Sequence, residues 1–162
     1  MVRSIADTSP LQYLYQLGLL HLLNDLFGRV AIPRAVVDEL AAGRRIGVAV
    51  PDPAQYLWLE VQEVAAAAVL PLAWDLGNGE REVLALALEQ PGALVILDDR
   101  LARQAAHTLG IPRIGTLGVL LRAKQARRIQ TVKLHLDQLD ALGFFVNAQT
   151  RLDVLRLAGE DS

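Results

Sequence analysis

Acidic side chains recur where a short apolar run of this chain gives way to a turn or to the start of a helix. Those that stand at such places are Asp7, Glu39, Glu80, Asp98 and Asp99. Carboxylates at the ends of strands and the beginnings of helices can converge in one cleft, because open parallel sheets bind their ligands there. Crowded carboxylates repel one another unless a hard cation such as Mg²⁺ or Mn²⁺ neutralises them. The sequence therefore predicts a metal-dependent site that these acids share.

The helical phase of the segment that opens at Gly79 distinguishes its first two glutamates. At about 100° per residue, Glu80 lies on the same side as Val83 and Leu84, which belong to the apolar stripe. Glu82 projects to roughly the opposite side. We therefore expect Glu80 to face the cleft and Glu82 to face solvent.

The other acids can be sorted in the same way. In the segment RAVVDEL, Glu39 falls at the edge of the apolar side and Asp38 on the far side, so Glu39 is the candidate. Asp7 follows an apolar run and precedes a helix start, and its alternative role is to cap that helix. Strand alternation sends Asp98 and Asp99 to opposite faces, so one reaches the shared site. The other then binds a second metal or caps the next helix.

The composition fits a single domain over residues 1–162. Hydrophobic residues make up 52% of the chain and charged residues 21%, which is enough apolar material for one core. Cysteine is absent, which excludes disulfides, thiolate metal sites and a cysteine nucleophile. No apolar run reaches the roughly 20 residues that cross a bilayer, and MVRSIADTSPL turns polar too early for a signal peptide. We therefore expect a cytoplasmic protein that does not enter a membrane.

Short β-like runs alternate with longer helical runs, which is typical of an α/β fold around a mostly parallel sheet. The expected strands are residues 4–7, 30–33, 57–64, 93–99 and 111–116, with an edge strand at 144–147. The expected helices are residues 11–26 behind an N-cap at Ser9, 34–42 closed by Gly43, a helix from Gly79 ended by Pro91, and 101–109, 117–128, 133–142 and 149–157. Residues 43–55 are expected to form a loop, and residues 65–79 a connection that packs on the core.

Four motifs in their order along the chain together resemble the PIN domain. They are ADTSPLQYL, LLNDLFGRVAIPRAVVDEL, GNGEREVLALAL and VILDDRLARQAAHTLGIPRIGTLGVLLRAK, and the likeness spans residues 3–147. It is greatest to a prokaryotic PIN-like branch of nucleic-acid-binding proteins, and it implies a three-layer α/β/α sandwich with a central, mostly parallel sheet. Active PIN domains are Mg²⁺- or Mn²⁺-dependent ribonucleases, and many are toxins of toxin–antitoxin pairs. The resemblance therefore implies hydrolysis of RNA phosphodiester bonds.

The resemblance also assigns roles to residues. The implied catalytic and metal-holding acids are Asp7, Glu39, Glu80 and Asp99, with Asp98 as a further metal ligand, and Thr8 or Ser9 supplies a hydroxyl beside the first acid. Many active members have Thr or Ser two residues before the last Asp, where this chain has Leu97. Thr116, at the end of the next expected strand, is the candidate to replace that hydroxyl.

This chemistry needs no side-chain nucleophile, because a metal activates water and stabilises the charge that develops during phosphodiester hydrolysis. The three histidines, His21, His107 and His135, are scattered and fit helix surfaces. A phosphatase of the haloacid-dehalogenase type needs a second Asp where Ser9 stands, and no P-loop motif occurs. The alternative that stays open is a PIN-like module that binds RNA or a protein without cleaving anything.

The expected partners follow from charge and from the family. The net charge of −2 is not typical of a nucleic-acid binder, although a bound metal would mask part of the acidic charge. The basic residues are uneven along the chain, and they form either a solvated helix face or a phosphate-contacting surface. They are the basic stretch 122–133, with Arg122, Lys124, Arg127, Arg128 and Lys133, and before it Arg100, Arg103 and Arg113. The candidates for contacts with RNA near the acids are Arg34, Arg44, Arg45 and Arg100, with ordinary solvated arginine as the alternative. The resemblance implies an antitoxin protein as a partner. The family commonly dimerises, and segment 11–26 has more apolar residues than one buried face needs, so we also expect a homodimer.

Overall fold

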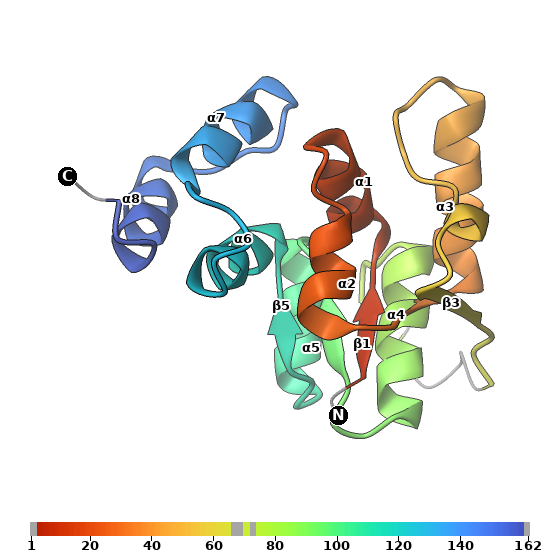
Figure 1. Ribbon diagram of the computed structural model, residues 1–162. Coiled ribbons are helices and arrows are strands. Elements are labelled where there is room, and N and C mark those ends of the chain that lie inside the picture. The colour runs from red at the N-terminus through yellow and green to blue at the C-terminus, as the bar shows by residue number, and fades with distance from the viewer. Residues whose placement is uncertain (1–2, 66–69, 72–73, 161–162) are drawn as a thin grey trace.

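The computed structural model describes residues 3–65, 70–71 and 74–160, and it has three layers with a parallel sheet in the middle (Figure 1). The strands are β1 (Ser4–Ala6), β2 (Val30–Pro33), β3 (Leu59–Gln62), β4 (Leu94–Ile96) and β5 (Arg113–Ile114), in the order β3-β2-β1-β4-β5. All four strand pairs are parallel. The α/β/α sandwich expected from the sequence is thereby confirmed.

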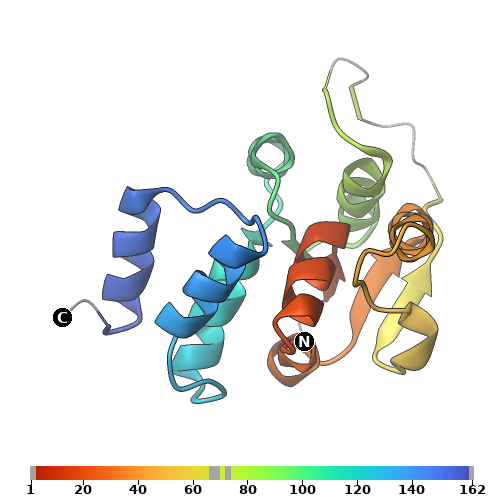
Figure 2. The same cartoon turned by 90° about the horizontal axis from the view of Figure 1, so that it is seen from above.

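Helices cover both faces of the sheet. They are α1 (Thr8–Gln16), α2 (His21–Phe27), α3 (Arg34–Arg45), α4 (Asn78–Glu89), α5 (Arg100–Thr108), α6 (Thr116–Gln125), α7 (Lys133–Ala141) and α8 (Ala148–Leu157), with a 3₁₀ turn, η1, at Pro53–Gln55. Figure 2 shows α1, α2 and α6 on one side of the sheet and α4 and α5 on the other. Along the described residues, no helix combines the length and apolar character needed to cross a membrane.

The three central strands form because their residues are buried on both faces. Every residue of β1, β2 and β4 is buried, and Ile5, Val95 and Ile96 are fully inaccessible to solvent. Continuous apolar runs of this kind are typical of parallel sheets that helices cover on both sides. The apolar stripes of the helices complete the core, for example Leu14 of α1 and Leu84 of α4.

The order of the strands reverses between β1 and β4. The chain leaves β1 for β2 on one side, whereas it leaves β4 for β5 on the other side. Such a reversal separates the two connections at the carboxyl ends of the strands, which is where open α/β sheets bind ligands. Ala6 pairs with Ile96 in this register, so the residues that follow them, Asp7 and Leu97, emerge side by side.

The single helix expected over residues 11–26 is wrong, because the structure has two helices there. Gly18 has a φ of 73°, which residues other than glycine rarely adopt. The turn around Gly18 separates α1 from α2. Leu11 and Leu22 are both fully buried, one from each helix. The apolar side chains of this segment therefore pack largely within the chain itself. The first helix also begins at Thr8, which puts Asp7 rather than Ser9 in the N-cap position.

The edge strand expected at residues 144–147 is also wrong. These residues connect α7 to α8, and Phe144 packs edge to face against Tyr13 at 4.9 Å between ring centroids. Asn147 accepts a hydrogen bond from the Thr150 backbone N–H at 2.8 Å and so caps α8. Capping and aromatic packing thus occupy the residues that an edge strand would need.

Smaller differences concern the ends of elements. Helix α3 runs through Gly43 to Arg45, because the backbone of Gly43 stays helical instead of turning left-handed. The third strand is shorter than residues 57–64. Of the connection over residues 65–79, residues 66–69 and 72–73 lie outside the described part of the chain, whereas Leu70 is buried in the core as expected.

Glu160 fastens the last helices to the body of the protein. Its carboxylate accepts hydrogen bonds from the Thr131 hydroxyl at 2.7 Å and from the Val132 and Lys133 backbone N–H groups at 2.8 and 3.1 Å. The ammonium of Lys124 on α6 pairs with the same carboxylate at 3.0 Å. Because one side chain joins the residue after α8 to the start of α7 and to α6, it controls the packing of this end.

We predict that Glu160→Gln destabilises the protein in a pH-dependent way. Burial raises the pKa of Glu160, but the hydrogen bonds from Val132, Thr131, Lys124 and Lys133 outweigh burial and lower this pKa from 4.5 to about 2. A carboxyl whose pKa is depressed by folding stabilises the protein above pH 4.5, and this stabilisation is lost as pH falls towards 2. At pH 7 we expect a loss of about 1–3 kcal/mol in the free energy of unfolding.

Urea unfolding at several pH values measures this effect. The difference between wild type and Glu160→Gln should shrink as the pH is lowered from 5 towards 2. Asp25→Asn, at an exposed position on α2, is the control and should change the free energy of unfolding little at any pH. Equal stability of wild type and Glu160→Gln at pH 7 would contradict the role of this carboxylate.

Candidate active site

Five acidic residues meet at the carboxyl edge of the sheet. Asp7 follows β1, Asp98 and Asp99 follow β4, Glu39 comes from α3 and Glu80 from the first turn of α4. Each of them interacts electrostatically with Asp7 or Glu80, as the raised pKa values of these two residues show. The structure therefore brings together all the acids that the sequence singled out.

Asp7 is the most deeply placed of these acids. Only 5% of the residue is exposed, and its Oδ1 atom is buried without a hydrogen-bond partner among the described residues. It occupies the N-cap position of α1, yet its side chain makes no capping hydrogen bond. Capping of α1 therefore does not account for this carboxylate, which leaves a buried oxygen able to bind a ligand.

The environment of Asp7 disfavours its negative charge. Burial raises the pKa of Asp7 from 3.8 to about 7, and repulsion by Glu39, Asp98 and Asp99 adds to the rise. The nearby backbone N–H of Thr8 offsets part of this increase. A cation placed among these carboxylates would reverse the effect, because it stabilises the ionised forms.

Glu80 has a similarly raised pKa. Its partial burial raises the pKa from 4.5 to about 7, and repulsion by Asp99 is the next contribution, followed by that of Asp7. A hydrogen bond shared with the Asp99 carboxyl favours the protonated form further, and Glu39 adds repulsion. Near neutral pH the protonated Glu80 carboxyl can therefore donate a hydrogen bond to Asp99.

Glu39 is held in position by two donors. The Thr8 hydroxyl donates to its Oε1 atom at 2.5 Å, and the Gly79 backbone N–H donates to its Oε2 atom at 3.0 Å. Gly79 has no room for a side chain, because an added Cβ would lie 2.5 Å from Glu39 Oε1. Glu39 thus joins α1, α3 and α4 at the edge of the site.

The adjacent acids after β4 have different environments. Asp98 accepts hydrogen bonds from the Ser9 hydroxyl at 2.9 Å and from both the backbone N–H and the hydroxyl of Thr116 at 2.7 Å. Asp99 caps α5, because its Oδ2 atom accepts from the Ala102 N–H at 3.0 Å. The sequence left open which of these two acids belongs to the site and which caps a helix. Asp99 does both, because it caps α5 and also interacts with Glu80.

The hydroxyl groups around the site act on carboxylates. Thr8 binds Glu39, while Ser9 and Thr116 bind Asp98. Leu97, at the position where a hydroxyl was expected from the family, is fully buried in the hydrophobic core. Its side chain therefore packs against apolar neighbours, and the hydroxyls nearest the acids come from α1 and α6.

One expectation about a neighbouring acid is wrong. Glu82 does not face solvent, because its Oε1 atom accepts a hydrogen bond from the Ala35 N–H at 2.9 Å in the first turn of α3. The α4 helix packs against α3, so the side that the projection assigned to water faces a neighbouring helix. Asp38 is exposed, as expected.

The four arginines expected near the site have different surroundings. Arg34 forms an ion pair with Glu63 at 3.0 Å, and Arg44 donates to the Pro51 carbonyl at 2.9 Å. Arg45 is exposed at the end of α3, and Arg100 is exposed at the start of α5, next to Asp99. Of the four, Arg100 is next to a candidate acid in the chain and opens the helix that Asp99 caps.

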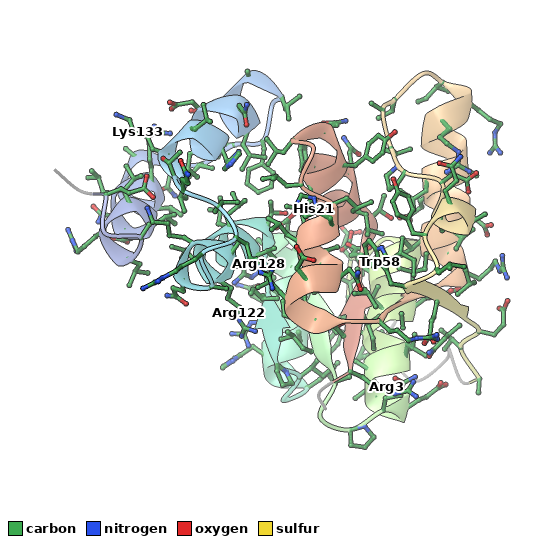
Figure 3. All side chains as sticks on the ribbon, viewed as in Figure 1. Arg3, His21, Trp58, Arg122, Arg128 and Lys133 are labelled. Carbon is green, nitrogen blue, oxygen red and sulfur yellow. The ribbon has the colours of Figure 1, made fainter. Side chains whose placement is uncertain are left out.

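Two of the five basic residues in stretch 122–133 have partners within the protein. Figure 3 shows Arg122, Arg128 and Lys133 near α6 and α7. The Arg122 guanidinium lies 5.6 Å from the centre of the Phe27 ring, in a cation–π contact, and Lys124 pairs with Glu160. Arg127, Arg128 and Lys133 are exposed, so a phosphate-contacting role for this stretch stays a prediction.

The sequence places Arg103 and Arg113 in a broad basic group and does not assign them to the acidic site. Arg103 and Arg113 line a cavity together with Asp98 and Arg100. The signal for Arg103 was its position three residues after Arg100, which puts both side chains on one face of a helix. Arg113 has no such local signal, because only the pairing of β5 with β4 brings it near α5.

The donor set fits a hard divalent cation. Carboxylate oxygens are the ligands that Mg²⁺ and Mn²⁺ prefer, and Asp7 Oδ1 is a buried oxygen that lacks a partner. In the described parts of the chain, no three acidic or histidine side chains are already gathered tightly enough to hold an ion. Glu39 and Asp98 instead bind hydroxyl and N–H donors of the protein.

Comparison with known proteins agrees with this geometry. A family model described as the PIN domain matches residues 3–160, and the chain therefore belongs to the PIN-domain family. PIN domains are in general nucleases, and they typically use divalent metals. A search of curated proteins finds no match to the chain.

We predict that Asp7→Asn stabilises the metal-free protein at alkaline pH. The folded protein holds the Asp7 proton more tightly than the unfolded chain, so stability falls as pH rises from about 4 to about 7. Asparagine resembles the protonated acid and carries no charge, so it avoids this loss. We expect a gain of about 1–3 kcal/mol at pH 8 and little change at pH 4, because one pKa unit corresponds to about 1.4 kcal/mol.

Thermal unfolding in EDTA at both pH values checks this. Asp38→Asn, on the exposed side of α3, is the control and should show no such dependence on pH. If Asp7→Asn is less stable than wild type at pH 8, the ionised Asp7 carboxylate does not destabilise the folded protein, and the prediction is wrong.

Proposed function

We propose that this protein is a metal-dependent ribonuclease that hydrolyses RNA phosphodiester bonds at the edge where β1 and β4 end. The observation that carries the proposal is the buried Asp7 carboxylate, which has an unpartnered oxygen and four other acids around it. Such a group is unfavourable in an apo protein and favourable once a cation binds. Natural proteins keep such unfavourable groups where function requires them.

The acids divide into two groups by their surroundings. Asp7, Glu80 and Asp99 would hold Mg²⁺ or Mn²⁺, since burial and then repulsion between carboxylates raise the pKa of the first two, and Asp99 lies within hydrogen-bond reach of Glu80. Glu39 and Asp98, fixed by hydroxyl and N–H donors, would complete the ligand set directly or through water. The cation supplies charge neutralisation and activation of water when it is bound.

The reaction consists of attack by water on phosphorus and cleavage of one P–O ester bond. The proton of the attacking water goes to solvent, because a cation held by Glu80 would lower the pKa of this carboxyl from its metal-free value of about 7 and keep it ionised. The ester oxygen that leaves takes a proton from solvent. Thr8, Ser9 and Thr116 act as positioning residues, since they bind Glu39 and Asp98.

A PIN module that binds RNA or a protein without cleaving it is the second candidate. Two observations favour it: Leu97 is buried where many active relatives have a hydroxyl, and Glu39 and Asp98 already have protein donors. A role as a toxin with an antitoxin partner, a homodimer, a cytoplasmic location and the extent of the domain over all of residues 1–162 stay predictions. Arg34, Arg44 and Arg45 likewise stay predicted contacts for RNA.

We predict that the wild-type protein cleaves single-stranded RNA in the presence of Mn²⁺ and that Asp7→Asn and Glu80→Gln lose this activity at least about 100-fold. Both changes keep the shape of the side chain and remove the charge that would bind the cation. Asp38→Asn is the matched control, because it removes an exposed carboxylate of α3, and it should cleave like wild type.

A second measurement separates the two candidate functions. Calorimetric titration with Mn²⁺ reports whether the metal binds, independently of cleavage. Binding of Mn²⁺ by a wild-type protein that cuts no RNA would leave the binding module as the function. Absence of Mn²⁺ binding would remove the metal site and the nuclease proposal together.

We also predict that Gly79→Ala weakens Mn²⁺ binding at least about tenfold with little loss of stability. The added methyl group would lie 2.5 Å from Glu39 Oε1, so the carboxylate must leave its place beside Thr8. Gly43→Ala on α3 is the control, because its Cβ would meet Val50 at an ordinary 3.5 Å. It should keep the Mn²⁺ affinity and raise stability by about 0.5–1 kcal/mol. Unchanged Mn²⁺ affinity in Gly79→Ala would contradict the role of Glu39.

A further inference from the structure

A basic cavity of about 790 Å³ opens beside the acidic site. Arg100 and Arg103 of α5 and Arg113 of β5 line it, and Asp98 lies at its border with the acids. Asn147, at the start of α8, closes the other side. In Figure 2 the helix α5 and the connection from α7 to α8 lie along the same side of the molecule.

The arginines of this cavity form no close ion pairs with the acids of the described residues. Each of the ion pairs found in the described residues involves another basic residue, so Arg100, Arg103 and Arg113 form none within 4.0 Å. All three residues are exposed, and in a chain with a net charge of −2 they concentrate positive charge in one place. An anion is the ligand that such a surface attracts.

The backbone brings this positive charge close to the acids. Gly115 has no side chain, and an added Cβ would lie 2.7 Å from Arg103 Nη1 and 3.0 Å from Asp98 Oδ1. The guanidinium of Arg103 and the carboxylate of Asp98 therefore face the same small space. Arg113 Nη2 lies 3.3 Å from His107 Nδ1, which holds its guanidinium at the cavity wall.

We propose that this cavity binds a backbone phosphate of the RNA strand, next to the phosphodiester that is cleaved. The inference rests on the proposed ribonuclease function and adds where the substrate lies. Guanidinium groups match phosphate in geometry and charge, since they donate two parallel hydrogen bonds. A strand with one phosphate among these arginines runs along Asp98 to the acids, so the cavity sets the direction in which RNA enters.

Binding of a fluorescein-labelled single-stranded RNA, measured by anisotropy in EDTA between 50 and 200 mM salt, tests the assignment without cleavage. We expect Arg103→Gln and Arg113→Gln each to raise the Kd about 3- to 10-fold. Each lost phosphate contact should lower the slope of log K against log salt by about 0.7, the value for single strands. Arg3→Gln, at an exposed arginine before β1, is the matched control and should change neither quantity.

Arg103→Lys tests whether the effect of Arg103→Gln is merely structural. Lysine keeps the positive charge, so this variant should keep most of the salt dependence of RNA binding. The assignment is overturned if the cavity variants bind RNA with the Kd and slope of wild type. It is equally overturned if Arg3→Gln loses as much as they do, or if wild type binds no RNA at 50 mM salt.

The failure of this inference is distinguishable from that of the proposed function. If wild type does not cleave RNA with Mn²⁺ but the cavity variants lose RNA binding and salt dependence, the nuclease proposal fails and the phosphate site stands. If wild type cleaves RNA while the cavity variants bind it unchanged, the nuclease proposal stands and the phosphate site fails.

Discussion

The crowding of negative charge at the edge where β1 and β4 end is the constraint on which the rest of this structure depends. The parallel register puts Asp7 beside the end of β4, and burial there leaves one of its oxygens without a partner. An isolated buried carboxylate is costly, and further carboxylates nearby increase the cost. The fold therefore has to hold this arrangement with interactions elsewhere.

Those interactions come from the helices that begin around this edge. Thr8 and Gly79 fix Glu39, and Ser9 and Thr116 fix Asp98, so that the first turns of α1, α4 and α6 are tied to the acids. The same donors that stabilise the fold also orient the carboxylates. This coupling explains why hydroxyl residues and a glycine without space for a side chain gather at this edge.

Positive and negative charges gather in separate but neighbouring parts of this protein. A net charge of −2 conceals an acidic site and, on the other side of Asp98, a cavity lined by three arginines. Opposite charges kept apart in this way can attract a cation and a polyanion to adjacent places. A nuclease that binds a metal ion and a phosphate backbone together needs that arrangement.

The sequence by itself determined the features that depend on local periodicity. The apolar runs defined β2 and β4, and helical phase selected Glu80 from its neighbours, because a helix or strand repeats the same geometry at every residue. Contacts between distant segments were decided only by the tertiary structure. Gly18 divides one expected helix in two, and Glu82 turns from solvent to the start of α3. Arg113 joins the arginines of α5 only because β5 pairs with β4, which no local pattern encodes.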